Sequence, residues 1–492
     1  MRTVHLLLCT LALACVAAQG GASFADARAA GASSPPNPYP RLVGHYVSRD
    51  EHPRVFTRRA ELTDLVTRIN EPGSFSAENF AKLATRVRGD LAAKNDWDVA
   101  YSGCKIDDYL YGFSYDDAHA AQVEMLRNDL HLGAEALPPI GAAIVASRAA
   151  LYATLARDGA RVPAGGPSPK DAIALAKRIL SAWARHGFRA ADGRYLDSNT
   201  QFCDDDGKFD AAASSAVGLQ VSRGILYSVQ AQDLLESLRA LRPDERRELD
   251  RFHRAIYDLV RNALDETAHG IPCNQFGNHK ANDLAGLLSI ARLLDDRRAF
   301  EAALYGNDRR LPVTLPWVAY FDRAVYGAHD TPNACYHNTG PNGLTSRPFF
   351  QTAVVAPGEI DDRFRNKDAA QGIGYPMFSL ERIFNAAEIL RIAGFDPYAY
   401  RGRHGQSIES AVRYYVCYAR HAGFEAIVTD ENGRACPDYA QYVGKTVSEE
   451  QNMLFGAYRF RDDAEITSVE RAARASPQAI DLDALRFGRW ND

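Results

Sequence analysis

Residues 273–283, CNQFGNHKAND, gather amide, imidazole and ammonium groups at the point where a long apolar helix is expected to begin. A single histidine at the start of a helix is more often structural than catalytic, but a core face would not tolerate the density of amide and cationic donors around His279. The N-terminal end of a helix also favours an anion. The segment is therefore predicted to bind a carboxylate-bearing ligand, with Asn278, His279 and Lys280 as candidate site residues.

A second segment of interest, GIGYPMFSL at residues 372–380, surrounds a tyrosine at the start of another predicted helix. Pro376 helps to fix the turn before this helix. Two cations that could bind a substrate carboxylate, Arg363 and Arg365, come shortly before Tyr375. Taken alone, the tyrosine is best explained by a core or lid role, and its interest lies in its combination with the asparagine-histidine pair.

Tyrosine, histidine, asparagine and arginine together are what β-elimination on a uronic acid requires. The C5 proton is weakly acidic because the adjacent carboxylate is charged, and groups that neutralise this carboxylate stabilise the enediolate-like transition state. Asn278 and Arg365 are predicted to do so. Tyr375 as tyrosinate, or His279 as neutral imidazole, would remove the proton, and the phenol would protonate the departing O4. Nearby cations must lower the phenol pKa from its ordinary value of about 10.

The stereochemistry of the sugar decides between these roles. In β-glucuronate and β-mannuronate the C5 proton and the C4 oxygen lie on the same side, so Tyr375 could act first as base and then as acid. In α-guluronate they lie on opposite sides, which would make His279 the base and Tyr375 the acid. The sequence leaves both cases open.

Other polar residues compete with these candidates or supplement them. Tyr336, His337 and Asn338 form a second constellation, in which Tyr336 would be the catalytic phenol and both it and His337 could contact substrate. Arg223 and Gln220 could bind a substrate carboxylate or hydroxyl, although an ordinary helix surface explains this pair equally well.

The elements that must position these groups are predicted to be helices. Apolar residues recur at the helical period in many segments joined by loops that are often long, which indicates packed helical hairpins and a mainly α fold. The period fades over residues 423–460, where a small β hairpin is expected. The periodic segments are 58–70, 80–91, 171–188, 222–241, 244–264, 283–304, 378–393 and 408–421.

Residues 1–18 combine a basic Arg2, an apolar run and a small-residue end, which is the layout of a secretory signal. Residues 19–40 are a flexible lead-in rich in Ala, Gly, Ser and Pro. The remaining residues, 41–492, are predicted to form one catalytic domain of a secreted or periplasmic monomer, with no membrane span. The net charge of −5 argues against a nucleic-acid partner.

Cysteine usage fits export to an oxidising compartment, because an even number of cysteines remains beyond the leader. Cys417 and Cys436 flank the expected hairpin and are predicted to form a disulfide. No CxxC pair, phosphate loop or dinucleotide fingerprint occurs in the sequence, so neither a metal nor a cofactor is expected. The cysteines are Cys104, Cys203, Cys273, Cys335, Cys417 and Cys436.

Several short segments of the chain resemble the alginate lyase superfamily of polysaccharide lyases. This resemblance implies an incomplete α/α toroid and a metal-independent elimination that uses Asn, His, Arg and Tyr, without a cofactor, on an acidic polysaccharide. The matching segments are HPRVF at 52–56, SRG at 222–224 with QDLL at 232–235, NH at 278–279 and YPMFSL at 375–380.

The chain departs from the family pattern in two places. The family has an arginine about seven residues before the tyrosine, whereas Asp368 stands there, so Arg365 or Arg363 must substitute. The interval from the asparagine-histidine pair to the tyrosine is also longer than in alginate lyases proper. The pattern is closest to a branch with glucuronan or mixed specificity.

Two other classes of protein remain as alternatives. A glycoside hydrolase on a similar α/α scaffold would need two carboxylates beside the scissile bond, for which Asp204, Asp205, Asp361 and Asp362 could be recruited. A non-catalytic protein that binds acidic polysaccharide would keep the groove without the proton chemistry.

Overall fold

The computed structural model describes residues 38–92, 139–186, 194–195, 211–270, 276–331, 355–362, 374–419 and 459–460. The chain divides into two compact units, Met1–Pro38 and Tyr39–Asp492, and every helix and strand of the described residues belongs to the second. The predicted leader, nearly all of the lead-in and of the expected hairpin, and the side chains of the expected Cys417–Cys436 pair lie outside the described residues.

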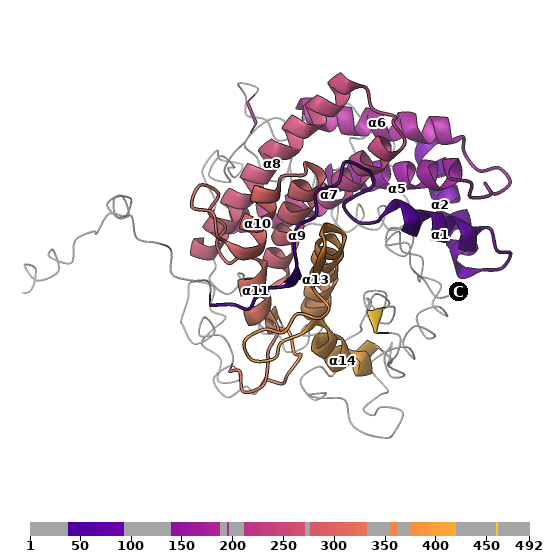
Figure 1. Cartoon of the computed structure of the whole chain (residues 1–492). Coiled ribbons are helices and arrows are strands. Elements are labelled where there is room, and N and C mark those ends of the chain that lie inside the picture. Colours follow the sequence, from indigo (N-terminus) through magenta and orange to yellow (C-terminus); the bar gives the residue numbers. More distant parts are fainter. Residues whose placement is uncertain are drawn as a thin grey trace, which may run out of the picture. The chain divides into compact units, whose positions relative to one another are not determined.

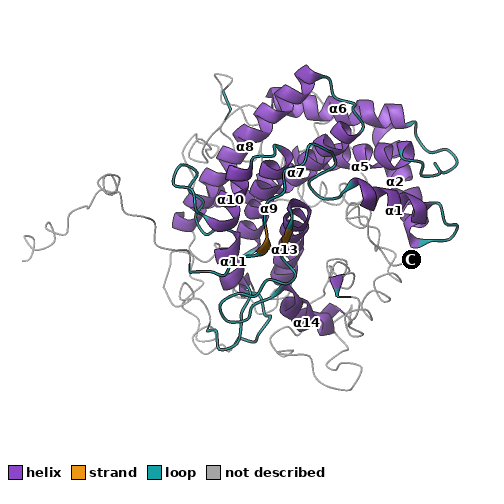
Figure 2. Ribbon diagram, viewed as in Figure 1, coloured by secondary structure: helices purple, strands orange, loops and turns teal. Residues whose placement is uncertain are grey.

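Helices dominate the described part of the chain, which confirms the mainly α prediction (Figures 1 and 2). Two short strands, β1 (Val43–Gly44) and β2 (Phe395–Asp396), pair antiparallel. No helix among the described residues is long and apolar enough to cross a membrane. The helices are α1 (Arg59–Ile69), α2 (Phe75–Ala92), α5 (Pro139–Arg157), α6 (Pro169–His186), α7 (Ala211–Ser237), α8 (Pro243–Gly270), α9 (Asn278–Leu293), α10 (Arg297–Tyr305), α11 (Trp317–Ala324), α13 (Gly374–Ala393) and α14 (Ile408–Ala419).

The helices form two layers. In the inner layer, α5, α7, α9 and α13 pack side by side in that order, while α6 packs on α5, α8 on α7 and α9, and α10 on α9 (Figure 1). The sequence explains this division. Every residue of α9 is buried, whereas α6 buries a single apolar stripe that includes Ile179 and Trp183. A helix that is buried all round needs neighbours on every side, and an amphipathic helix can face water.

The inner helices α7 and α9 run parallel. Ser222 of α7 donates a hydrogen bond to Asp283 in the first turns of α9, with 3.1 Å between Oγ and Oδ1. Further along both helices, Arg54 links their ends: its N–H donates to Asp233 of α7 (2.9 Å) and its Nη2 donates to the carbonyl of Leu293, the last residue of α9 (2.6 Å). Both helices therefore finish at the same end of the inner layer.

Residues 42–58, which we call the N-terminal strap, cross this end of the layer (Figure 1). The Val47 N–H donates to the carbonyl of Ala393, the last residue of α13 (2.8 Å), and β1 pairs with β2 just beyond it. Arg58 Nη2 donates to the carbonyl of Arg391 (3.1 Å). Guanidinium donors at the C-terminal end of a helix satisfy its last carbonyls and complement its dipole. The helix α13 therefore ends beside α7 and α9, at what we call the strap end.

At the strap end, the inner helices α7, α9 and α13 are each followed within two residues by a residue in the left-handed conformation. Gly394 (φ 106°) follows α13, where glycine adopts this conformation freely. Arg239 (φ 54°) and Asp295 (φ 51°) stand in the corresponding places after α7 and α9. A residue with a Cβ costs about 1 kcal/mol there, so contacts of these two side chains are expected to offset the cost.

Two predictions about helix positions are wrong. The periodic segment 283–304 is two helices, because Asp296 caps α10 by accepting a hydrogen bond from the N–H of Ala299 (3.0 Å), after α9 has ended at Leu293. The helix α11 lies between the periodic segments 283–304 and 378–393, where the sequence predicts no helix. Its side chains Trp317 and Phe321 stack in the core, with 5.1 Å between ring centroids.

Candidate active site

The candidate site begins in the first turn of α9, at the end of the inner layer opposite the strap. Asn278 is the first residue of this helix and follows Gly277. The exposed fractions of Asn278, His279 and Lys280 are 3%, 6% and 1%. The polar groups that the sequence singles out are therefore buried, in surroundings where hydrogen bonds and charges act more strongly than in water.

A buried carboxylate, Asp362, joins the start of α9 to the start of α13. Its Oδ2 accepts hydrogen bonds from the N–H of Asn278 (2.8 Å) and the hydroxyl of Ser379 (2.9 Å). Gly277 makes this approach feasible, since a Cβ at that position would collide with the carboxylate. The anion at this helix end is thus the protein's own. The N–H of Asn278 is therefore already engaged, and binding of a substrate carboxylate by the side chains of this segment stays a prediction.

Two buried tyrosines bind the segments on either side of the Asn278–Asp362 contact. Tyr320 donates to the carbonyl of Gly277 (3.3 Å), and Tyr326 donates to Asp361. Burial and the charge of Asp362 raise the pKa of Tyr320 well above its ordinary value, so this phenol stays protonated. Asp361 and Asp362 are 0% and 1% exposed. Both are therefore engaged in structural contacts, unlike the two accessible carboxylates that a glycosidase requires.

Lys280 and Asp283 lie next to each other on α9, and Asp283 faces α7. Burial raises the pKa of Asp283 to about 8, against the opposing effects of the Lys280 charge and the hydrogen bond from Ser222. Lys280 is thus near a carboxyl group of its own chain. Its role in substrate binding stays a prediction.

The remaining predicted residues are placed only in part. Tyr375 is the second residue of α13, one turn before Ser379, so the backbone at its position lies near the start of α9. Its side chain lies outside the described residues. The same holds for the side chains of the other predicted site residues, which are Gln220, Arg223, Tyr336, His337, Arg363 and Arg365. Among the described residues, no three His, Cys, Asp or Glu side chains are grouped so that they could hold a metal ion.

Sequence reasoning missed a second buried cluster, at the strap end. Asp233 accepts hydrogen bonds from the N–H groups of Arg54 and Val55, both 2.9 Å from its Oδ2, and its Oδ1 lies 2.6 Å from Nδ1 of His52. The HPRVF and QDLL segments therefore contact each other, and the carboxylate of Asp233 on α7 fixes the strap. An aspartate between buried apolar residues of a helix is the signal that could have indicated it.

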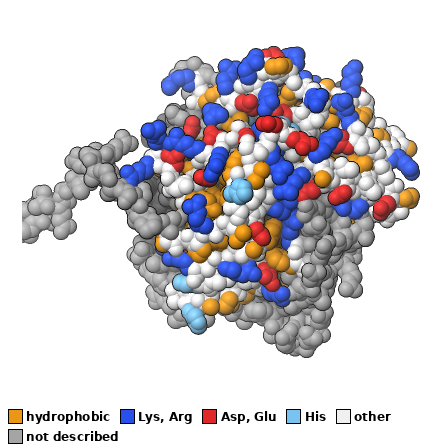
Figure 3. Space-filling view, in the orientation of Figure 1, with side chains coloured by type: hydrophobic (Ala, Val, Ile, Leu, Met, Phe, Trp, Pro, Cys, Tyr) orange, Lys and Arg blue, Asp and Glu red, His pale blue; other side chains and the backbone are white. Residues whose placement is uncertain are grey.

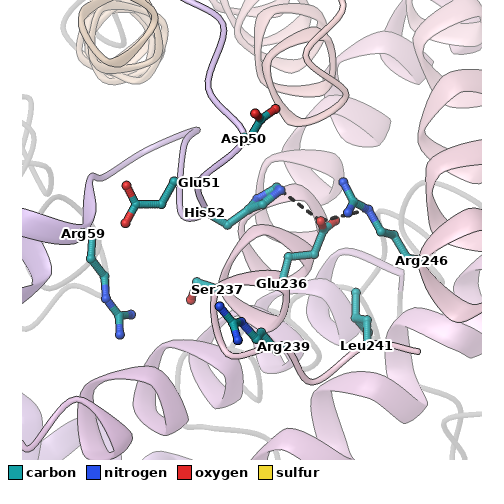
Figure 4. Close-up of a pocket in the computed structure, with 9 residues that line it drawn as sticks. All are labelled: Asp50, Glu51, His52, Arg59, Glu236, Ser237, Arg239, Leu241 and Arg246. Carbon is teal, nitrogen blue, oxygen red and sulfur yellow. Dashed lines mark ion pairs between the residues drawn. The ribbon is translucent and has the colours of Figure 1, made fainter. Parts of the chain in front are cut away.

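His52 is held between the carboxylates of Asp233 and Glu236, and Figure 4 shows its contact with Glu236. Its Nε2 lies 3.0 Å from Oε2 of Glu236, which is also 3.0 Å from Nε of Arg246. Burial lowers the pKa of His52, but the hydrogen bonds to Asp233 and Glu236 outweigh this effect and raise it to about 9. His52 is therefore a cation at neutral pH.

The surface drawn in Figure 3 shows basic side chains scattered among acidic ones over the described residues. Whether nucleic acid is a partner stays a prediction from the net charge of the sequence.

Comparison with solved structures shows a likeness in fold. No protein-family model matches the chain, and no curated protein matches it. The crystal structure of an alginate lyase from Bacteroides ovatus superposes with a TM-score of 0.52, over 89% of this chain and 99% of that one, at 11% sequence identity. The chain has an alginate lyase-like helical fold. At this identity the likeness shows the fold alone, and it does not distinguish one specificity branch from another.

Proposed function

We propose that this protein is a polysaccharide lyase that cleaves a polyuronate by β-elimination. The observation that carries the proposal is the joint at Asp362, which fixes the start of α9, with Asn278 and His279, beside the start of α13, with Tyr375. The alginate lyase-like fold supports the reaction class.

In the proposed reaction, the amide of Asn278 and the guanidinium of Arg365 neutralise the carboxylate at C5. A base, Tyr375 or neutral His279, takes the C5 proton. The electron pair of the C5–H bond forms the C4=C5 double bond, the C4–O4 bond breaks, and the phenol of Tyr375 protonates O4. Hydrogen bonds to the developing enediolate are worth most in a buried site, such as the one around Asn278.

The finer parts of the proposal concern substrate and location. We propose a glucuronan or alginate-type polymer as substrate, because of the sequence departures from alginate lyases proper. The leader-like residues 1–18 support export to the periplasm or the medium, where such a polymer would be encountered. The protein would act as a monomer.

Ultraviolet absorbance during incubation with glucuronan, polymannuronate, polyguluronate and pectate, in the presence of a chelator, tests the reaction class. Elimination gives an absorbing alkene conjugated to the carboxylate. New reducing ends without an increase in absorbance, on any of these polymers, would show that the protein is a hydrolase and not a lyase.

Tyr375→Phe tests the assignment of the phenol, with Tyr336→Phe as the matched control. Removal of a catalytic acid-base group is expected to lower kcat by about 10²- to 10⁴-fold, while binding of the polymer stays nearly unchanged. A large loss in Tyr336→Phe, with Tyr375→Phe still active, would transfer the role to Tyr336.

A further inference from the structure

A cavity of about 580 Å³ opens at the strap end, far along the inner helices from Asn278. It lies where the strap meets the end of α7, beside the cluster of His52 and Glu236 (Figure 4). The residues that line it are unusually rich in charge. They are Asp50, Glu51, His52, Arg59, Glu236, Ser237, Arg239, Leu241 and Arg246.

Most of the cations in this cavity are already neutralised. Arg246 pairs with Glu236 (3.0 Å), which is also paired with His52 (3.0 Å), and Arg59 pairs with Asp158 (2.9 Å). Arg239 differs from them, because within the described residues its guanidinium has no carboxylate partner. The cavity therefore offers one guanidinium for a ligand.

The backbone at Arg239 gives an independent reason to expect a use for this side chain. Arg239 and Asp295 occupy equivalent left-handed positions after α7 and α9: in each case the next residue's N–H bonds back to the helix, from residue 240 to Leu235 and from Asp296 to Ala291 (both 2.9 Å). Glycine is favoured at such a position.

Asp295 shows what such a side chain can do. It accepts hydrogen bonds from Tyr46 (2.8 Å) and Ser48 and lies 3.4 Å from Arg292, so it fastens the strap. Arg239 makes no comparable contact with the described part of the chain, although it bears the same backbone strain. A ligand in the cavity would supply the missing partner.

The other groups in the cavity indicate the kind of ligand. Asp50 and Glu51 stand at the cavity and make no ion pair with other described residues, so that their oxygens can accept from hydroxyl groups. Ser237 adds a hydroxyl. A ligand that has one carboxylate and several hydroxyl donors satisfies both the guanidinium and the carboxylates.

We propose that this cavity binds an acidic sugar residue, with Arg239 on the sugar carboxylate and Asp50 and Glu51 on its hydroxyls. The class of ligand follows from the cavity, and its identification as a uronate rests on the proposed function. A second site on the same chain would raise the effective concentration of polymer near the enzyme. Polymers would therefore be bound more tightly than fragments that reach only one site.

Calorimetric titration with a glucuronic acid trisaccharide tests the proposal, in a Tyr375→Phe background that prevents turnover. We expect two binding sites in this parent and one after Arg239→Gly, with affinity at the lost site at least about tenfold weaker. Glycine suits the left-handed backbone, so this variant is expected to fold with an unchanged or higher Tm. Arg247→Ala is the control, since Arg247 is exposed on α8 and does not line the cavity.

Several outcomes would overturn the proposal. An identical titration for Arg239→Gly and its parent would remove Arg239 from any binding role. Equal binding of a neutral glucose trisaccharide would exclude recognition of the carboxylate. Displacement of the trisaccharide by sulfate at equal concentration would mean that the cavity binds anions in general and does not recognise a sugar.

The titration is independent of the proposed reaction. If no polymer yields the absorbing alkene, the lyase assignment fails while the titration still decides whether the cavity binds an acidic sugar. If the alkene forms and the titration shows a single site, the cavity proposal alone fails.

Discussion

The two ends of the inner layer use opposite charges on the same helices. At the starts of α9 and α13, the buried carboxylate of Asp362 accepts hydrogen bonds from both. At the strap end, Arg54 and Arg58 donate to the carbonyls of Leu293 (2.6 Å) and Arg391 (3.1 Å). Each end carries the charge that its helix dipoles favour.

The ends differ in what these contacts achieve. Asp362 fixes the relative position of two helix starts that carry the proposed catalytic residues. At the strap end, Asp233 and His52 fasten the extended strap to the C-terminal end of α7. Substitutions at the first end should therefore change rates more than stability, and substitutions at the second should do the reverse.

The largest effect is expected for Asp233→Ala. This change leaves protonated His52 and two strap N–H groups without their buried acceptor, and we expect a loss of about 4 kcal/mol in the free energy of unfolding. Urea denaturation measures it, with Asp258→Ala on the exposed side of α8 as control. A loss no larger than that of the control would mean that the joint does not fasten the strap.

The second effect concerns pH. The pKa of His52 rises from 6.5 to about 9 on folding, which corresponds to about 3 kcal/mol of stability. Because the folded pKa lies above the unfolded one, this stability is complete below pH 6.5 and is lost as the pH rises towards 9. Urea midpoints measured across that range should fall in the native protein and stay flatter in His52→Gln. Parallel curves for the two proteins would contradict the assignment.

At the other end, Asp362→Asn is expected to act mainly on the rate. An amide keeps the shape of the side chain. Because it has one oxygen and no charge, it binds the N–H of Asn278 and the hydroxyl of Ser379 less well. We expect kcat on the preferred polymer to fall by about 10- to 100-fold through misplaced helix starts, with a small change in KM. Asp361→Asn, in the same turn but bonded to Tyr326, is the matched control. Equal losses of kcat in both variants would point to general damage of the turn.

The smallest effect is expected for Ser379→Ala. It removes the hydroxyl that donates to Oδ2 of Asp362 and should lower the free energy of unfolding by about 1 kcal/mol. Combined with Asp362→Asn, its effect on kcat should be less than additive, because both changes weaken the same joint. Simple additivity in this double-mutant cycle would separate Ser379 from the joint.

Local patterns could predict part of this molecule. The apolar period predicts α6 and the core of α13, and the cluster around Asn278 predicts where α9 begins. These features depend on residues within one or two turns of each other. The break before α10 was missed because the apolar period continues through Asp295 and Asp296, although an aspartate is a good cap.

Contacts between distant segments could not be predicted in this way. Nothing near Asp362 in the sequence indicates that it caps a helix starting 84 residues earlier. The link from His52 to Asp233 spans 181 residues, and the two segments are recognisable only as separate short motifs. Periodicity reports which face of a helix is buried, but not which partner buries it.

The strap has a consequence for the order in which the chain folds. Arg54 bonds to Leu293 across 239 residues, and Val43 pairs with Asp396 in the small sheet. Closing such long loops is entropically costly until the rest of the layer has formed. We therefore expect the helical hairpins to assemble first and the strap to dock last, so that a segment synthesised before every described helix completes the fold.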